Sequence, residues 1–133
     1  MTLKHTRAHM IRSTMEGIVY SMKESYAIFQ SLGIRAQRMI AAGGGANSRL
    51  FCQLQADMYQ CPVYTNQGKE QAGIGAAMTA AVGSGYFRSY EEACDSMVHL
   101  SSQVTEPVSA NVRRYEEEFQ RFKEIYHANK RLF

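Results

Sequence analysis

The sequence has no long apolar run. No stretch approaches the length of about 20 residues that a helix needs to cross a bilayer, and the N-terminus lacks the apolar core of a signal peptide. The net charge is only +3, and the basic residues are scattered among acids. A nucleic-acid-binding surface usually shows clustered Lys and Arg. We therefore expect a cytoplasmic protein with neither a membrane nor a nucleic acid as its partner.

Paired cysteines and dense metal-ligand motifs are also missing. The three cysteines are an odd number without a CxxC spacing, and two of them, Cys52 and Cys61, fall in or beside a predicted helix. This placement is typical of buried, reduced thiols. His5 and His9 have the four-residue spacing of helical metal ligands, but no third ligand is close in sequence. The sequence therefore predicts neither a disulfide framework nor a metal site.

What the chain does contain is an α/β pattern. Helical periodicity or capping signals cover residues 5–32, 48–60, 70–82, a segment that starts at Ser89, and about 110–130. Two short apolar segments, residues 37–42 and 62–65, are typical of buried strands, and residues 99–110 are expected to form a connector. Because a helix separates the two strands, they should pair in parallel, with the helices packed on this short sheet.

Two helices carry distinctive surfaces. The first has an apolar stripe that we expect to face the core: Ile11, Met15, Ile18, Met22, Tyr26 and Phe29. The alanine-rich segment 70–82 contains Gly73 and Gly75, which suggests that this helix packs very closely against a neighbour.

Two parallel strands do not make a stable sheet, because parallel sheets need cover on both faces and usually more strands. We therefore expect residues 1–133 to be one partial domain of a larger unit. Six large side chains on the first helix, worth about 1.5–3 kcal/mol each when buried, should not stay in water. We expect a homodimer that buries this helix; the alternative is a monomer whose last two helices fold over it.

A glycine triplet stands between the first strand and the next helix, in "MIAAGGGANSRLFCQLQADMY" (residues 39–59). A strand that runs through a glycine turn into a helix exposes amide groups beside the positive helix end, which suits a ligand. The triplet lacks the Gly-Lys-Ser/Thr ending of a Walker loop, and "GGGANS" lacks the last glycine of the dinucleotide fingerprint. A tight structural turn without a ligand is the alternative.

Longer segments carry a family resemblance. In order, "HTRAHMIRSTMEGI", "MIAAGGGANSRLFCQLQADMYQCPVY" and "EQAGIGAAMTAAVGSGYFRSYEEA" resemble the C-terminal domain of the FGGY carbohydrate kinases, most closely the xylulokinase-like branch. The ending "VRRYEEEFQRFKEIYHANKRLF" looks like the terminal helix of the same family. The resemblance implies part of an actin-like, ribonuclease-H-like fold in two lobes, with ATP and sugar in the cleft between them.

By this resemblance, Gly43, Gly44 and Gly45 belong to the nucleotide site, with the first two against the adenosine of ATP. A purine stacked on the backbone tolerates no Cβ atom, so glycine is physically reasonable there. Either Asn47 or Ser48 would contact the base, since the family has a short polar side chain at this helix start.

The catalytic parts of such a kinase lie outside the matched segments. The family's general-base aspartate, its phosphate contacts and its sugar-binding lobe come earlier in the chain than any segment matched here. We therefore expect no catalytic residue in this sequence, and Mg²⁺ bound with ATP mainly by other segments. Asp57 should be a solvated helical acid, and Glu16 should have a structural role.

These observations lead to three hypotheses about function. The first is the adenosine-binding portion of an ATP-dependent kinase for xylulose or a related pentulose, inactive on its own. The second is a non-catalytic interaction or structural protein derived from such a kinase. The third is an unrelated α/β domain whose glycine turn binds another nucleotide.

Overall fold

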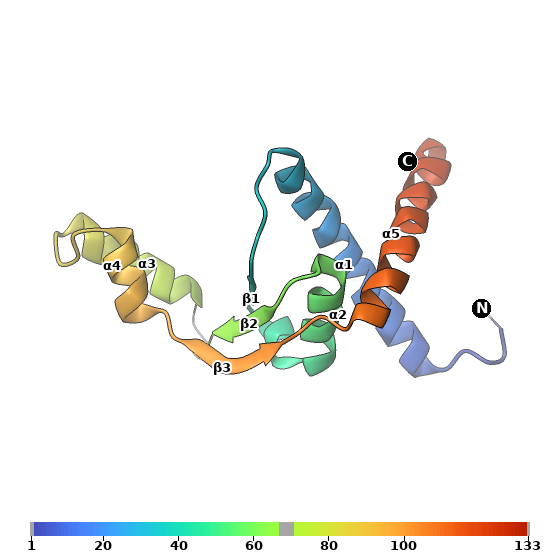
Figure 1. Cartoon of the computed structure of the whole chain (residues 1–133), viewed down its shortest axis with the longest axis horizontal. Coiled ribbons are helices and arrows are strands. Elements are labelled where there is room, and N and C mark those ends of the chain that lie inside the picture. Colours follow the sequence, from blue (N-terminus) through green and yellow to red (C-terminus); the bar gives the residue numbers. More distant parts are fainter. Residues whose placement is uncertain (1, 67–70, 133) are drawn as a thin grey trace.

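The computed structural model describes residues 2–66 and 71–132. Along the described chain the helices and strands are α1 (Arg7–Ser31), β1 (Met39–Ala41), α2 (Arg49–Tyr59), β2 (Val63–Asn66), α3 (Gln71–Gly83), α4 (Tyr90–Met97), β3 (Leu100–Thr105) and α5 (Ser109–Asn129), with short 3-10 helices η1 (Gly44–Asn47) and η2 (Lys130–Leu132) (Figure 1). None of the helices in these two ranges combines the length and apolar character needed to cross a bilayer.

The strands form one small mixed sheet in the order β1-β2-β3. β1 and β2 are parallel, with Met39 opposite Val63, which confirms the predicted pair. β3 runs antiparallel to β2, with Thr105 also opposite Val63, so the prediction of a connector over residues 99–110 is wrong. Three of the six residues of β3 are exposed and the other three are only partly buried, so its sequence carries little of the apolar–polar alternation that marks a strand.

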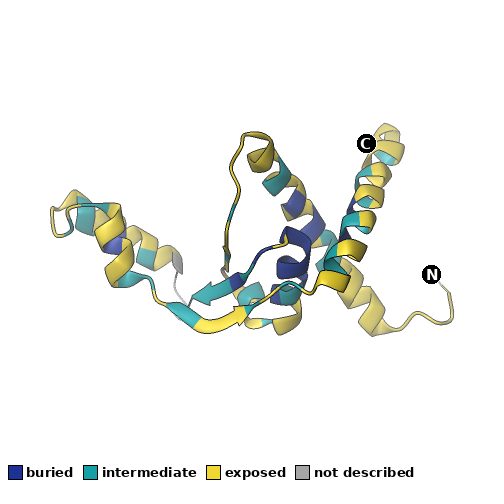
Figure 2. Ribbon diagram, in the orientation of Figure 1, coloured by how far each residue is buried: buried dark blue, intermediate teal, exposed yellow. Residues whose placement is uncertain are grey.

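The core centres on α2. Three of its side chains, Leu54, Ala56 and Met58, are exposed by 1% or less. Helices α1 and α5 both pack on this helix, and they also contact each other where Tyr20 of α1 stacks on Phe119 of α5 at 6.0 Å between ring centroids. Figure 2 shows buried residues gathered along α2 and on the faces of α1 and α5 that lie toward it.

The buried face of α1 differs from the predicted stripe. It consists of Val19, Tyr20 and Lys23. Of the predicted stripe, Met15 and Tyr26 are partly buried, and the other four side chains are exposed: Ile11, Ile18, Met22 and Phe29. A helix turns about 100° per residue, so packing against α5 through Tyr20 rotates the stripe partly away from the core. The stripe is apolar, but much of it is uncovered in this chain.

Helices α3 and α4 pack against each other at one end of the molecule, away from α1, α2 and α5 (Figure 1). Among the described side chains of α3 and α4, Met78 and Ala93 are buried and most others are exposed. Gly73 is exposed, and a Cβ atom at Gly75 would meet nothing within 4 Å. The prediction that these glycines allow close packing is therefore not met by the described neighbours.

Asp57 is not a solvated acid, as the sequence suggested, but is exposed by only 1%. Its Oδ1 accepts hydrogen bonds from the Gln53 side chain and the Val108 amide, both at 2.8 Å, and its Oδ2 accepts one from the Asn111 side chain at 2.8 Å. Val108 is the residue that caps the start of α5. The carboxylate thus satisfies a free amide at this helix start and lies at the positive helix end.

We predict that Asp57→Ala lowers the free energy of unfolding by about 2–4 kcal/mol, because it leaves three donors without their acceptor. Asp57→Asn should cost less, since its Oδ1 can still accept from the Val108 amide and Asn111 can turn its amide oxygen toward the new NH₂ group. Urea unfolding of both variants measures the difference. A loss below about 1 kcal/mol for Asp57→Ala would contradict the role of this carboxylate.

Candidate functional site

The glycine triplet connects β1 to α2 through a single 3-10 turn. The Gly43 carbonyl accepts a hydrogen bond from the Ala46 amide at 3.1 Å, and the Gly45 carbonyl accepts one from the Ser48 amide at 3.0 Å. The turn follows the carboxyl end of a parallel strand and precedes a helix. In open α/β sheets this is the position at which ligands bind.

The structure gives a different reason for glycine at each of the three positions. Gly43 has a φ of +73°, a conformation that favours glycine. A Cβ atom at Gly44 would meet nothing within 4 Å, so this backbone is open to an approaching molecule. At Gly45 a Cβ atom would lie 2.7 Å from the ring of Phe51, so packing within the turn itself excludes a side chain.

Of the two residues expected to contact the base, Ser48 caps the start of α2. Its hydroxyl oxygen accepts a hydrogen bond from the Phe51 amide at 3.3 Å. A hydroxyl group can donate its own hydrogen at the same time, so Ser48 keeps the ability to contact a ligand. The Asn47 side chain is exposed, and no described residue forms a hydrogen bond with it. Both residues therefore remain able to contact a base.

A hollow of about 170 Å³ lies beside the turn, between α2 and the sheet. Its polar lining comes from Asn47, Arg49, Thr65, Gln103 and Thr105. The last two residues lie on β3, a strand in a segment that was predicted to be a connector, and neither was predicted as a site residue. The Val104–Thr105 pair, just before the Glu106–Pro107 break, was the available strand signal, but it is short.

The electrostatic character of the turn is positive. The first turn of α2 contains Arg49 and no acid, and the helix start itself carries partial positive charge. Burial raises the pKa of the Cys52 thiol, which keeps this neighbour protonated and unreactive. None of the described residues that line the hollow is a carboxylate or a histidine. The turn can therefore bind an electron-rich ligand, but it offers no group suited to proton transfer.

The other candidate groups lie in structural contacts. Glu16 accepts hydrogen bonds from the Arg12 side chain and from the Tyr115 hydroxyl, both at 2.9 Å, which supports its expected structural role between α1 and α5. His9 accepts a hydrogen bond from the Thr6 amide at 3.1 Å. In the two described ranges, no three His, Cys, Asp or Glu side chains gather closely enough to hold a metal ion.

A family model, a related sequence and a solved structure all show that this chain is similar to carbohydrate kinases. The model of the C-terminal domain of the FGGY family of carbohydrate kinases matches residues 1–84. The xylulose kinase of Bacillus subtilis is 35% identical over 128 residues, which cover 96% of this chain and 26% of that protein. The crystal structure of xylulose kinase from Rhodospirillum rubrum superposes with a TM-score of 0.84 at 26% identity, over 99% of this chain and 27% of that one.

A further solved structure extends the similarity in fold. A xyloylose kinase from Brucella ovis gives a TM-score of 0.86 at 21% identity, over 100% of this chain and 27% of that chain. This chain thus spans about a quarter of the length of the curated relatives and solved structures that it matches.

Alanine at Gly45 and alanine at Gly44 make a matched pair of variants that tests how the glycine turn is packed. Gly45→Ala should lower the free energy of unfolding by about 1–3 kcal/mol, because its Cβ atom displaces the Phe51 ring from the core. Gly44→Ala, with open space around it, should change stability by about 0.5 kcal/mol or less. Thermal or urea unfolding of the two variants separates them, and equal losses would contradict the described packing of the turn.

Proposed function

Because this chain belongs to the FGGY family of carbohydrate kinases, we propose that residues 43–48 are the adenosine-binding surface of an ATP-dependent sugar kinase. The fold is α/β with a small mixed sheet and is part of the actin-like ATPase fold of such kinases. Within it, residues 1–133 would be a partial domain on the nucleotide side of the cleft. The substrate we propose is xylulose or a related pentulose, after the names of the relatives.

The observation that carries the proposal is the open backbone at Gly44. Since a Cβ atom placed there meets nothing within 4 Å, no part of the described protein requires glycine for packing at this position. A flat purine lying on the peptide backbone does require it, because a side chain would occupy the place of the ring. Gly43, at positive φ, sets the direction of the chain into this surface.

Asn47 or Ser48 would select the base. The Asn47 amide presents both a donor and an acceptor, which matches the amino group and adjacent ring nitrogen of adenine. The Ser48 hydroxyl accepts from the Phe51 amide and can donate one hydrogen bond to a ring nitrogen. Single replacements of each residue by alanine distinguish the two contacts.

In the reaction, these residues would hold the nucleotide in place. Transfer of the γ-phosphoryl group depends mainly on positioning and on charge stabilisation by Mg²⁺ and phosphate-binding groups. The turn supplies positioning of the adenosine end, while we assign the Mg²⁺ contacts, the base that accepts the sugar proton and the sugar contacts to segments of a longer kinase. By itself the chain is expected to bind a nucleotide without transferring phosphate.

We predict that Gly44→Val abolishes ATP binding while the fold is retained, because the branched side chain fills the purine position. Isothermal titration calorimetry with MgATP measures the affinity, and circular dichroism checks the fold. Gly17→Val is the matched control: a Cβ atom at Gly17 also meets nothing within 4 Å, but the residue lies on α1. ATP affinity that is unchanged by Gly44→Val would remove the adenosine assignment.

The proposed partner of the isolated chain is a second copy of itself. Helix α5 covers Tyr20 and its neighbours on α1, but the adjacent apolar face of α1 stays open, with Ile18, Met22 and Phe29 each exposed by about half. Such a face favours association, because covering each large side chain is worth about 1.5–3 kcal/mol. A two-fold pairing of α1 with its copy would cover this face in both chains.

Light scattering at micromolar concentration tests this pairing. We predict a mass of twice the 15.0 kDa chain, and a shift to a monomer for the double variant Ile18→Glu/Met22→Glu. Ile125→Glu serves as the control, since Ile125 is equally apolar and 61% exposed but lies on α5. A wild-type chain that stays at 15.0 kDa would contradict self-association.

A further inference from the structure

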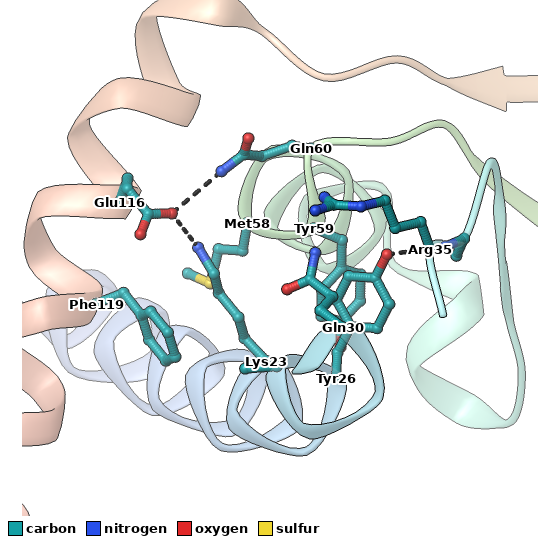
Figure 3. A pocket seen from close by; sticks show the side chains of 11 residues that line it. Lys23, Tyr26, Gln30, Arg35, Met58, Tyr59, Gln60, Glu116 and Phe119 are labelled. Carbon is teal, nitrogen blue, oxygen red and sulfur yellow. Dashed lines mark hydrogen bonds and ion pairs between the residues drawn. The ribbon is translucent and has the colours of Figure 1, made fainter. Parts of the chain in front are cut away.

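A cavity of about 370 Å³ lies between α1, the end of α2 and α5 (Figure 3). Met58, Tyr59 and Gln60 form its wall on the side of α2. The glycine turn is at the other end of the same helix, which rises about 16 Å over its eleven residues. This cavity is therefore separate from the proposed adenosine surface.

One side of the cavity holds a satisfied ion pair. The Lys23 side chain is largely buried, and its ammonium group lies 2.7 Å from Oε2 of Glu116. The Gln60 side chain donates to the same oxygen at 3.1 Å. The hydrogen bond from Lys23 holds the pKa of Glu116 below its ordinary value, so the pair stays charged at neutral pH. Because Lys23 balances its negative charge, the Glu116 carboxylate repels a second anion only weakly.

The other side of the cavity carries donors without acceptors. The Arg35 guanidinium and the Gln30 amide have no hydrogen-bond partner among the described residues, and Figure 3 shows both head groups on the same side of the cavity, directed toward its interior. The Tyr26 hydroxyl accepts a hydrogen bond from the Ala36 amide at 3.0 Å, which fixes the segment that carries Arg35. Two free donor groups, one of them cationic, thus converge on the same space.

The rest of the lining is apolar. Met58, Tyr59 and Phe119 contribute thioether and ring surface to the lining, with Phe119 on the side of Lys23 and Tyr59 on the side of Gln30 (Figure 3). The ionic lining consists of two cations, Lys23 and Arg35, and one carboxylate, Glu116, so its net charge is positive. A ligand that matches this surface has an anionic head for Arg35 and Gln30 and an apolar body for the aromatic wall.

We propose that this cavity is a binding site for a small organic anion, a carboxylate or a phosphate ester with an apolar body, held by Arg35 and Gln30. The volume is at the lower end of the range for small-molecule sites, so the ligand is a metabolite-sized molecule rather than a polymer. Its lining consists of residues of this chain, at the end of α2 opposite the glycine turn.

Calorimetric titration of the full chain with benzoate and with phenyl phosphate tests the proposal. Both probes carry a ring and an anionic head, and the tighter of the two identifies the head group that the site prefers. Arg35→Gln should weaken binding of that probe by about tenfold or more, because it removes a charge-assisted hydrogen bond. Arg38→Gln is the matched control, since Arg38 is an exposed arginine of the same connecting segment but does not line the cavity.

Benzamide, which has the same ring without the charge, supplies the second control and should bind about tenfold more weakly than benzoate. Failure of both anions to bind at millimolar concentration would overturn the proposal. Equal loss of affinity in the Arg35→Gln and Arg38→Gln variants would overturn it as well, because the effect would then be one of net charge. Arg35 is exposed, so its variant should fold, and circular dichroism verifies this.

Discussion

The Asp57 carboxylate lies on the most buried helix of the chain, where a charge is stable only when donors surround it. Its three partners come from its own helix, from the residue that caps α5 and from the first turn of α5. Gln53, one of these partners, also donates to the Glu106 carbonyl just after β3. The need to satisfy one buried charge thus joins α2, the end of β3 and the start of α5.

This junction has consequences at both ends of α2. At its start, Ser48 caps the helix, and the glycine turn is held between β1 and the Phe51 ring. At its end, Gln60 reaches the Glu116 carboxylate on α5 and closes one side of the cavity. A helix that is fixed in its last turn by Asp57 therefore holds the glycine turn at one end and the cavity at the other, the two places for which we propose ligands.

The sequence predicts those parts of the molecule whose signal is local. The apolar segment before the triplet, the triplet itself and the apolar period of α2 lie within about twenty residues, and the structure confirms β1, α2 and β2, which pairs in parallel with β1. The glycines of the turn were also identified, although only the structure separates the steric requirement at Gly45 from the open backbone at Gly44.

The parts that were missed depend on distant partners. The donors to Asp57 outside its own helix lie more than fifty residues away along the chain, so a carboxylate beside Met58 looked solvated. Packing of Tyr20 on α5 determines which face of α1 is buried, and the apolar stripe of α1 alone does not. β3 forms because β2 offers an edge, although its own pattern is weak. Tertiary context decided each of these cases.

We propose that the open backbone between β1 and α2 binds adenosine. Nitrogen-15 NMR of the labelled chain, titrated with ATP, observes this backbone directly through its amide signals. We predict that the largest chemical-shift changes occur at residues 43–48 and in the first turn of α2, with little change at the far end of α2 near Gln60. Shifts that avoid residues 43–48 while ATP binds elsewhere would contradict it.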